Sequence, residues 1–169
     1  PQAGIEEFTR ASKDHPQNVE VAAALGIALM QAGQAGPAAE QLARTRELAK
    51  QKGQRVPQMI ALSALADLAI QRRDMAQAKR FAAELEALAP KTEPTLLLQA
   101  RLALMDNRLS DAQGAVQSLL AMSPENPRAK LLQSAVSMSQ GNFEQAEMYL
   151  SGLVAKNPKD TVARQMLMQ

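Results

Sequence analysis

Residues 127–160 read PRAKLLQSAVSMSQGNFEQAEMYLSGLVAKNPKD, and this stretch contains the clearest local pattern of the chain. Two runs rich in helix-forming residues are separated by Gly141, and the second run ends before Pro158. Glycine can take the left-handed conformation that ends a helix, and proline stops a helix because it has no backbone N–H. Ala146 lies inside the second run, where a small side chain lets two helices approach closely. The stretch therefore predicts a pair of antiparallel helices.

The same pattern recurs at a fixed interval along the chain. Ala78, Ala112 and Ala146 follow one another at 34 residues. A proline comes twelve residues after each alanine, at Pro90, Pro124 and Pro158. Gly4 and Ala38 fall in the same slot nearer the N-terminus, because Pro16 follows Gly4 by twelve residues. Self-similarity at this interval is typical of helical-repeat architectures.

One interval is longer than the others. Ala38 and Ala78 are 40 residues apart rather than 34. We expect the six extra residues to lie around residues 46–58, RELAKQKGQRVPQ, where they would lengthen a helix and the loop that follows it.

The 34-residue period, the Leu25 and Gly26 pair, and the turn glycines Gly33 and Gly141 resemble the tetratricopeptide repeat. The resemblance implies an all-α helical-repeat solenoid, a right-handed superhelix of antiparallel helix pairs. It would hold about four full repeats, with partial repeats at both ends. Composition also favours helices, since Leu, Ala and Met supply most apolar residues and aromatic residues make up 2% of the chain.

We expect a single solenoid over residues 1–169. Residues 1–18 would hold the second helix of a partial repeat, and residues 161–169 would begin a further repeat. The full repeats would cover residues 19–58, with an extended second helix, and then 59–92, 93–126 and 127–160. Helices are expected at 3–14, 19–32, 37–52, 58–72, 75–88, 94–106, 109–122, 127–140, 143–156 and 160–169. Both ends should expose surfaces that neighbouring repeats would cover.

The residue types argue against a catalytic or cofactor-binding role. Cysteine is absent and His15 is the sole histidine, so no Ser-His or Cys-His nucleophile and no Cys/His metal site can be assembled. No Gly-rich phosphate-binding loop occurs. We therefore expect no enzyme activity, no metal and no cofactor.

Charge does not indicate a nucleic-acid partner. The formal net charge is +2, from 19 basic and 17 acidic residues. Basic clusters occur at 44–50 and 72–80, but acidic residues are interleaved with them and no aromatic platform accompanies them. We interpret these clusters as solvated helix surface and expect no nucleic acid to bind.

The resemblance implies where a partner protein would bind. In tetratricopeptide proteins the first helix of each repeat lines a concave groove, with positions 2, 5, 9, 12 and 13 pointing into it. Position 1 of the four full repeats is Val19, Met59, Glu93 and Pro127, in this order. The residues that we expect to form a partner-binding groove are Ile27, Met30, Ile60, Asp67, Ile70, Leu97, Arg101, Leu104 and Met105. The family's carboxylate-binding set of Lys, Asn and Arg is missing, so an amphipathic helix or apolar segment suits this groove better.

A competing interpretation places these side chains in the core. Lys130, Gln133, Ser134 and Ser137 form a polar stripe on the face that the family normally buries. This stripe predicts either a rotated helix or a register shifted by one residue. In both cases neighbouring apolar residues such as Leu131 would be inside, and the groove would be more polar.

A narrower resemblance concerns residues 140–158, QGNFEQAEMYLSGLVAKNP, with VAR at 162–164. This segment is similar to the TPR-repeat lipoproteins of the PEP-CTERM/exosortase systems, which are encoded with exopolysaccharide genes. The resemblance implies a scaffold in the bacterial periplasm or cell envelope, attached to a membrane only through an anchor outside this sequence. The alternative is a cytosolic regulatory or adaptor module. In either case the exposed terminal helices could support self-association.

Overall fold

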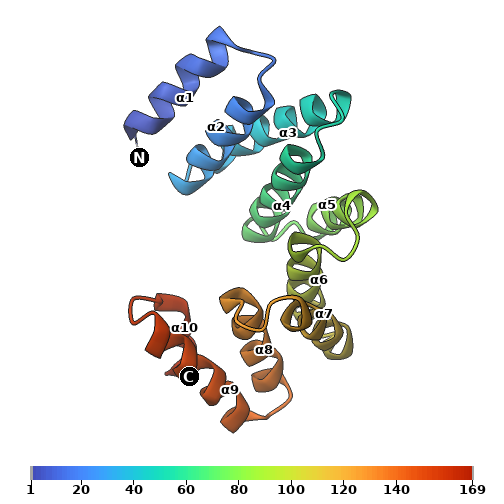
Figure 1. Cartoon of the computed structure of the whole chain (residues 1–169), viewed down its shortest axis with the longest axis vertical. Helices are drawn as coiled ribbons and strands as arrows, with labels where there is room; N and C mark the ends of the chain where they lie inside the picture. Colours follow the sequence, from blue (N-terminus) through green and yellow to red (C-terminus); the bar gives the residue numbers. More distant parts are fainter. Residues whose placement is uncertain (1, 169) are drawn as a thin grey trace. The chain divides into compact units, whose positions relative to one another are not determined.

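The computed structural model describes residues 2–168, and within that range it holds ten helices and no strand (Figure 1). The helices are α1 (Gln2–Asp14), α2 (Val19–Gln31), α3 (Ala35–Gln51), α4 (Arg55–Gln71), α5 (Met75–Leu88), α6 (Glu93–Met105), α7 (Leu109–Met122), α8 (Pro127–Ser139), α9 (Phe143–Lys156) and α10 (Thr161–Leu167). Every observed end lies within three residues of the expected one. The all-α helical-repeat fold is confirmed.

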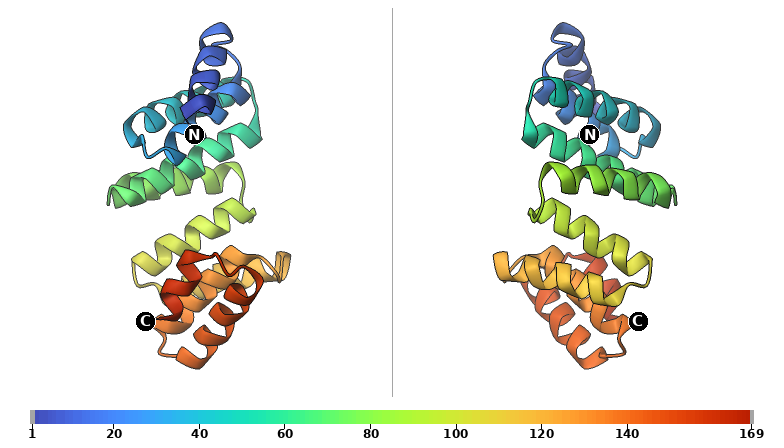
Figure 2. Two further views of the ribbon diagram at one scale, coloured as in Figure 1. Left: turned by 90° about the vertical axis from the view of Figure 1, so that its left-hand side faces the viewer. Right: turned by 90° about the vertical axis from the view of Figure 1, so that its right-hand side faces the viewer.

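The chain divides into two compact units, Pro1–Pro90 and Lys91–Gln169, called unit 1 and unit 2 below. Unit 1 contains α1 to α5, and unit 2 contains α6 to α10. Within each unit, helices that follow one another in the chain pack side by side and run antiparallel (Figures 1 and 2). The division into repeats stays a prediction.

Small residues let the two helices of a pair approach closely. A Cβ atom built on Gly26 of α2 would lie 2.8 Å from Cγ and Cδ2 of Leu42 on α3. At the same repeat position the other first helices carry small buried residues: Ala66, Ala100 and Ser134. On the second helices, Ala112 and Ala146 are buried as expected. These contacts set the distance between the paired helices.

The six extra residues lengthen helices and not a loop. α3 and α4 each have 17 residues. The later second helices, α5, α7 and α9, have 14 residues each, and the other first helices, α2, α6 and α8, have 13. The connection between α3 and α4, residues 52–54, is one residue shorter than the four-residue connections between other pairs. The expected longer loop is therefore wrong. Continuing both helices satisfies more backbone groups within the helices than a loop would.

The polar stripe of α8 is buried without any rotation of the helix. Ser134 and Ser137 are fully buried, and Gln133 is nearly so. The Ser134 hydroxyl donates to the carbonyl of Lys130 at 2.9 Å, and the Ser137 hydroxyl donates to Oε1 of Gln145 on α9 at 2.9 Å. The expected rotation or register shift is thus wrong, because hydrogen bonds let these polar side chains occupy the inner face.

Four turns inside helix pairs use the left-handed conformation. Gly33 and Gly141 have φ of 75° and 79°, as expected of turn glycines. The equivalent turns of the two middle pairs place Arg73 and Asn107 there, with φ of 59° and 57°. A side chain disfavours this conformation, less for Asn than for Arg. The repeat geometry therefore imposes a conformational cost at Arg73.

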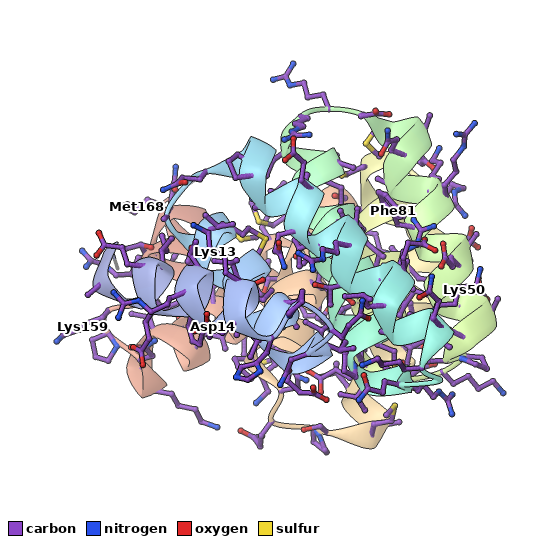
Figure 3. The ribbon with its side chains drawn as sticks, turned by 90° about the horizontal axis from the view of Figure 1, so that it is seen from above. Lys13, Asp14, Lys50, Phe81, Lys159 and Met168 are labelled. Carbon is purple, nitrogen blue, oxygen red and sulfur yellow. The ribbon has the colours of Figure 1, made fainter. Side chains whose placement is uncertain are left out.

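Basic side chains tie helices and loops together in unit 1. The Nε atom of Arg46 on α3 lies 3.4 Å from a carboxylate oxygen of Glu84 on α5, and the guanidinium carbon of Arg46 lies 5.9 Å from the ring centre of Phe81. Figure 3 labels Phe81 on α5. Arg44 donates to the carbonyl of Pro16 at 2.7 Å, and Arg72 donates to the carbonyl of Ala35 at 2.7 Å. These three arginines of the basic clusters therefore have structural contacts.

Three charged side chains form an ion cluster in unit 2. Glu125, in the connection between α7 and α8, accepts hydrogen bonds from Lys156 of α9 and from Lys130 of α8, the latter at 2.9 Å. The hydrogen bonds of Lys156 and then Lys130, with the positive charge of both, lower the pKa of Glu125 from 4.5 to about 2. The cluster joins the connection to the end of α9.

Replacing Arg73 by glycine should stabilise the protein. The change removes a side chain from the left-handed region, a gain of about 1–2 kcal/mol that the greater freedom of glycine in the unfolded chain reduces to roughly 0.5–1 kcal/mol. Urea unfolding measures this change in the free energy of unfolding. Asn107→Gly is the matched control and should raise the free energy of unfolding by less than Arg73→Gly does, because Asn tolerates the left-handed conformation better than Arg. An unchanged or lower unfolding free energy for Arg73→Gly would contradict the strain at this turn.

The pH dependence of stability should change when Glu125 loses its charge. Because folding lowers this pKa from 4.5 to about 2, the ion cluster stabilises the protein above pH 4.5, and the contribution is lost as the pH falls from 4.5 through 2. We expect Glu125→Gln to lower the melting temperature at pH 7 and to match the wild type below pH 2. The control Glu144→Gln removes an exposed carboxylate of α9. Equal melting temperatures for wild type and Glu125→Gln at pH 7 would show that the cluster does not stabilise the fold.

Candidate functional site

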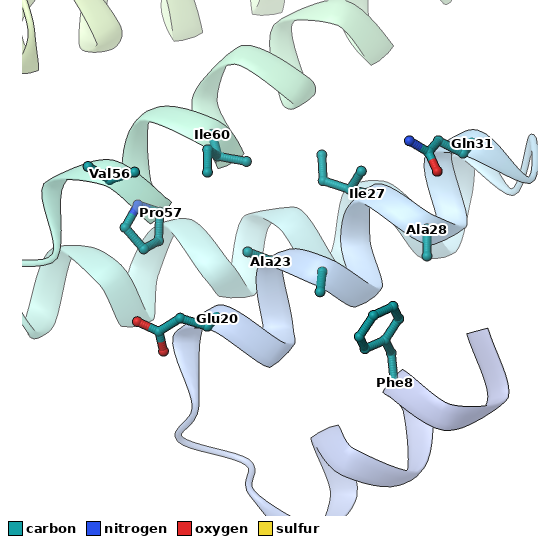
Figure 4. Close-up of a pocket in the computed structure, with 10 residues that line it drawn as sticks. Phe8, Glu20, Ala23, Ile27, Ala28, Gln31, Val56, Pro57 and Ile60 are labelled. Carbon is teal, nitrogen blue, oxygen red and sulfur yellow. The ribbon is translucent and has the colours of Figure 1, made fainter. Parts of the chain in front are cut away.

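An apolar groove of about 650 Å³ lies between α1, α2 and α4 of unit 1 (Figure 4). The α1–α2–α4 groove is lined by Phe8, Glu20, Ala23, Ala24, Ile27, Ala28, Gln31, Val56, Pro57 and Ile60. Figure 4 shows the ring of Phe8 rising from α1 toward α2, and Ile27 and Ile60 on the facing helices α2 and α4. The groove is therefore built by three helices that belong to different pairs.

The surface of the groove is mostly aliphatic and open to solvent. Phe8 is 36% exposed and Ile60 is 40% exposed. Glu20 and Gln31, at opposite ends of α2, are the polar lining residues. A carboxylate oxygen of Glu20 accepts a hydrogen bond from Nε2 of Gln54 at 3.0 Å. Such a surface can bury apolar groups of a partner, and none of its lining side chains is cationic.

The lengthened helix α4 contributes one end of this groove. Val56 and Pro57 stand in its first turn, and Val56 is 65% exposed. Repeats without the extra residues have first helices of 13 residues, which begin later in the repeat. The six-residue extension therefore adds an apolar wall to the groove.

The structure places the groove residues expected from unit 1 in three settings. Ile27 and Ile60 line the α1–α2–α4 groove. Met30 is half-buried and packs against the core formed by Leu25 and Leu29 with α3 and α4. Asp67 and Ile70 are half-buried and do not line this groove. Two expected residues are thus brought together here.

The groove residues expected from unit 2 also differ in their burial. Leu97 is buried in a cluster with Leu96, Leu119 and Ala129, which favours the core interpretation for this residue. Leu104 is half-buried beside another core cluster, and Arg101 is half-buried. Met105 is 52% exposed. The burial of Leu97 follows from α7 and α8, which both pack against α6.

Sequence reasoning missed Phe8, Ala24, Ala28, Val56 and Pro57. Phe8 and the two alanines do not occupy positions 2, 5, 9, 12 or 13 of a first helix, so the groove positions of the family do not include them. Val56 and Pro57 lie upstream of position 1, in the extension. The irregular 40-residue interval was the one signal that could have drawn attention to these two residues.

A second cavity, of about 380 Å³, lies in unit 2 between α8, α9 and the connection before α10. Lys130, Lys156 and Tyr149 are among its lining residues. Both lysines are paired with Glu125, so their charges are already compensated. This cavity is therefore a weaker candidate than the α1–α2–α4 groove.

Within residues 2–168 no three His, Asp or Glu side chains gather where they could hold a metal ion. None of the described helices has the length and apolar character needed to cross a membrane.

Comparisons with known proteins identify the repeat type. Residues 103–169 match the sequence model of the tetratricopeptide repeat family. A search of curated proteins gives no match.

Solved structures resemble the fold over nearly the whole chain. A thermophilic tetratricopeptide protein of Thermus thermophilus is 21% identical with a TM-score of 0.71, over 98% of this chain and 89% of that one. A tetratricopeptide repeat protein of Parabacteroides merdae is 16% identical with a TM-score of 0.69, over 96% of this chain. This chain spans 62% of the length of the Parabacteroides protein.

A third structure is YrrB, described as a tetratricopeptide protein with an unusual peptide-binding site. It is 11% identical with a TM-score of 0.54, over 98% of this chain and all of that one. The chain therefore has the fold of tetratricopeptide repeat proteins throughout, and its residues 103–169 carry the sequence pattern of that family.

Proposed function

We propose that this chain is a non-catalytic protein-interaction module, and that its α1–α2–α4 groove holds an apolar segment of a partner protein. The observation that carries the proposal is the group of large apolar side chains, Phe8, Ile27 and Ile60, that lie around an open groove of about 650 Å³. Exposing such side chains to water is unfavourable, and clustered exposed apolar groups are typical of binding surfaces.

The polar groups of the groove narrow the type of partner. A partner carboxylate would need convergent cationic donors, whereas the groove offers Glu20 and Gln31. An amphipathic helix or an extended apolar segment needs mainly aliphatic contact, which the lining supplies. The peptide-binding site named for YrrB supports the view that this fold can present such a site.

We further propose a role in a bacterial envelope system, linked to exopolysaccharide biosynthesis or export or to PEP-CTERM protein sorting. The support is the similarity of residues 140–158 to lipoproteins of those systems. Location in the periplasm or cell envelope is part of the same proposal. Fractionation of the native protein tests it: recovery with the envelope favours this role, and recovery in the cytosol favours an adaptor module there.

Partner binding through the groove should be lost when Ile60 becomes Asp. Ile60→Asp places a charge where an apolar partner segment would have to desolvate it, so binding should weaken at least tenfold, about 1.4 kcal/mol. The measurement is quantitative capture of proteins from the source organism, with each variant checked for folding by circular dichroism.

Phe143→Asp is the matched control for this prediction. Phe143 is a 66% exposed apolar residue of α9 in unit 2, outside the groove. A partner of the groove should be lost by Ile60→Asp and retained by Phe143→Asp. If every captured protein binds the folded Ile60→Asp variant as well as the wild type, the groove is not the binding site.

A further inference from the structure

The cavity of unit 2 lies beside a carboxylate that two lysines hold. It has a volume of about 380 Å³ and is lined by residues of α8, of α9 and of the connections before and after this helix pair. The volume falls within the range of roughly 300–1,000 Å³ that is typical of ligand pockets. All of its lining residues belong to unit 2, so the cavity is separate from the α1–α2–α4 groove.

Part of the cavity wall is apolar. Leu153 of α9 is buried, and Met148 and Tyr149 lie one turn before it on the same helix. Pro127 lines the cavity at the start of α8. An apolar side chain that enters the cavity would leave water and contact these residues, which is favourable.

A glycine leaves the space of this cavity open. Gly152 lines the cavity and stands six residues after Ala146, and a Cβ atom placed on it would have no atom within 4 Å. Arg44, at the same position of α3, extends to the carbonyl of Pro16 in the connection before its own helix pair, at 2.7 Å. The last pair has no side chain at this position. The second helices of the other three pairs all carry one there: Arg44, Glu84 and Ser118.

Two ammonium groups from different helices converge at the rim of the cavity. Nζ of Lys130 on α8 donates to Oε1 of Glu125 at 2.9 Å, and Nζ of Lys156 on α9 donates to Oε2 of the same carboxylate. The hydrogen bonds of Lys156 and Lys130 lower the pKa of Glu125 from 4.5 to about 2. A carboxylate is therefore the group that this pair of lysines is arranged to bind.

Glu125 can leave these lysines at small cost. It stands in the connection between α7 and α8, residues 123–126, and its side chain and that of Lys156 are each 67% exposed. Exposed ion pairs contribute little to stability, because water solvates the separated charges well. The carboxylate of another molecule can therefore take the place of Glu125 when further contacts favour the exchange.

We propose that this cavity binds an acidic side chain of a partner protein together with an apolar side chain next to it in the partner's sequence. The acidic side chain takes the place of Glu125 between Lys130 and Lys156, and the apolar side chain enters the cavity beside Leu153. Glu125 occupies the lysines while no partner is bound. The site is additional to the α1–α2–α4 groove and does not depend on the function proposed for that groove.

The surroundings favour an acidic side chain over the carboxylate of a chain terminus. Glu125 reaches the two lysines from a connection that continues in both directions, so a segment that continues on both sides can present a carboxylate there. The remaining charged lining residue is Asp160, which accepts hydrogen bonds from the backbone N–H groups of Val162 and Ala163. Its charge is thus directed toward the start of α10.

Titration with short peptides tests the site. Tyr149 is the sole tyrosine of a chain without tryptophan, and it lines the cavity, so its fluorescence reports binding there. The probe is the acetylated and amidated peptide Gly-Leu-Glu-Gly, and the control peptide has Gln in place of Glu. We expect a Kd of about 1 mM for the Glu peptide and binding at least fivefold weaker for the Gln peptide. No saturable signal up to ~20 mM, or equal binding of the two peptides, would overturn the proposal.

Two substitutions test the parts of the site. Glu125→Gln should tighten binding of the Glu peptide about fivefold at pH 7, because it removes the competing carboxylate. Gly152→Leu should abolish binding by filling the cavity, and the free space around this position lets the variant fold. Gly114→Leu is the matched control, since Gly114 of α7 also has free space but lies outside the cavity. This control should bind like the wild type.

Circular dichroism checks that each variant is folded. Unchanged or weaker binding by folded Glu125→Gln would contradict the exchange of carboxylates. Binding retained by folded Gly152→Leu, or lost by Gly114→Leu, would show that the peptide does not occupy the cavity.

Two further measurements separate this site from its alternatives. A peptide Gly-Gly-Leu with an acetylated N-terminus and a free C-terminal carboxylate should bind more weakly than the Glu peptide, and tighter binding would overturn the choice of an acidic side chain. Ile60→Asp should bind the Glu peptide like the wild type, because Ile60 lies in unit 1. Loss of the Glu peptide through Ile60→Asp would place it in the α1–α2–α4 groove and overturn the site in unit 2. Failure of the groove would leave the peptide titration of the cavity unchanged.

Discussion

The close approach of two helices at a small residue is the contact on which this structure depends. Gly26 brings α2 so near to Leu42 that a methyl group in its place would lie 2.8 Å from that side chain. In the last complete pair the equivalent positions hold Ser134 and Leu150, which are both buried. Since dispersion contacts and apolar burial both fall off quickly with separation, this approach lets a core of Leu and Ala, with few aromatic residues, hold the pairs together.

The sequence was sufficient to predict the helices because the features that define them are local. Gly33 and Gly141 mark turns, and the prolines after Ala78, Ala112 and Ala146 mark the ends of pairs. Features that depend on tertiary contacts could not be predicted in the same way. Ser137 is buried because Gln145 on the next helix accepts its hydrogen bond, and the polar pattern alone suggested a rotated helix. The extension was located correctly, but its effect on helix rather than loop length depends on how α3 and α4 pack.

The candidate site could be predicted only in part for a related physical reason. Ile27 and Ile60 were found because they occupy positions that face the groove in any regular repeat. Leu97 occupies the same kind of position, yet α7 and α8 bury it together with Leu96. Phe8 was missed because its position is normally buried within a pair, and it is exposed here since no described helix covers that face of α1. The groove is thus lined by residues of the repeat's groove positions together with residues outside those positions.

The central claim is that the α1–α2–α4 groove is the binding surface of this chain. Nuclear magnetic resonance can test it directly in a sample with labelled isoleucine methyl groups, titrated with a partner protein captured from the source organism. We expect the methyl signals of Ile27 and Ile60, which line the groove, to shift on binding, while the signals of Ile70, which does not line it, stay in place. Shifts at Ile70 alone, or no shift of Ile27 and Ile60 in a saturated sample, would contradict the claim.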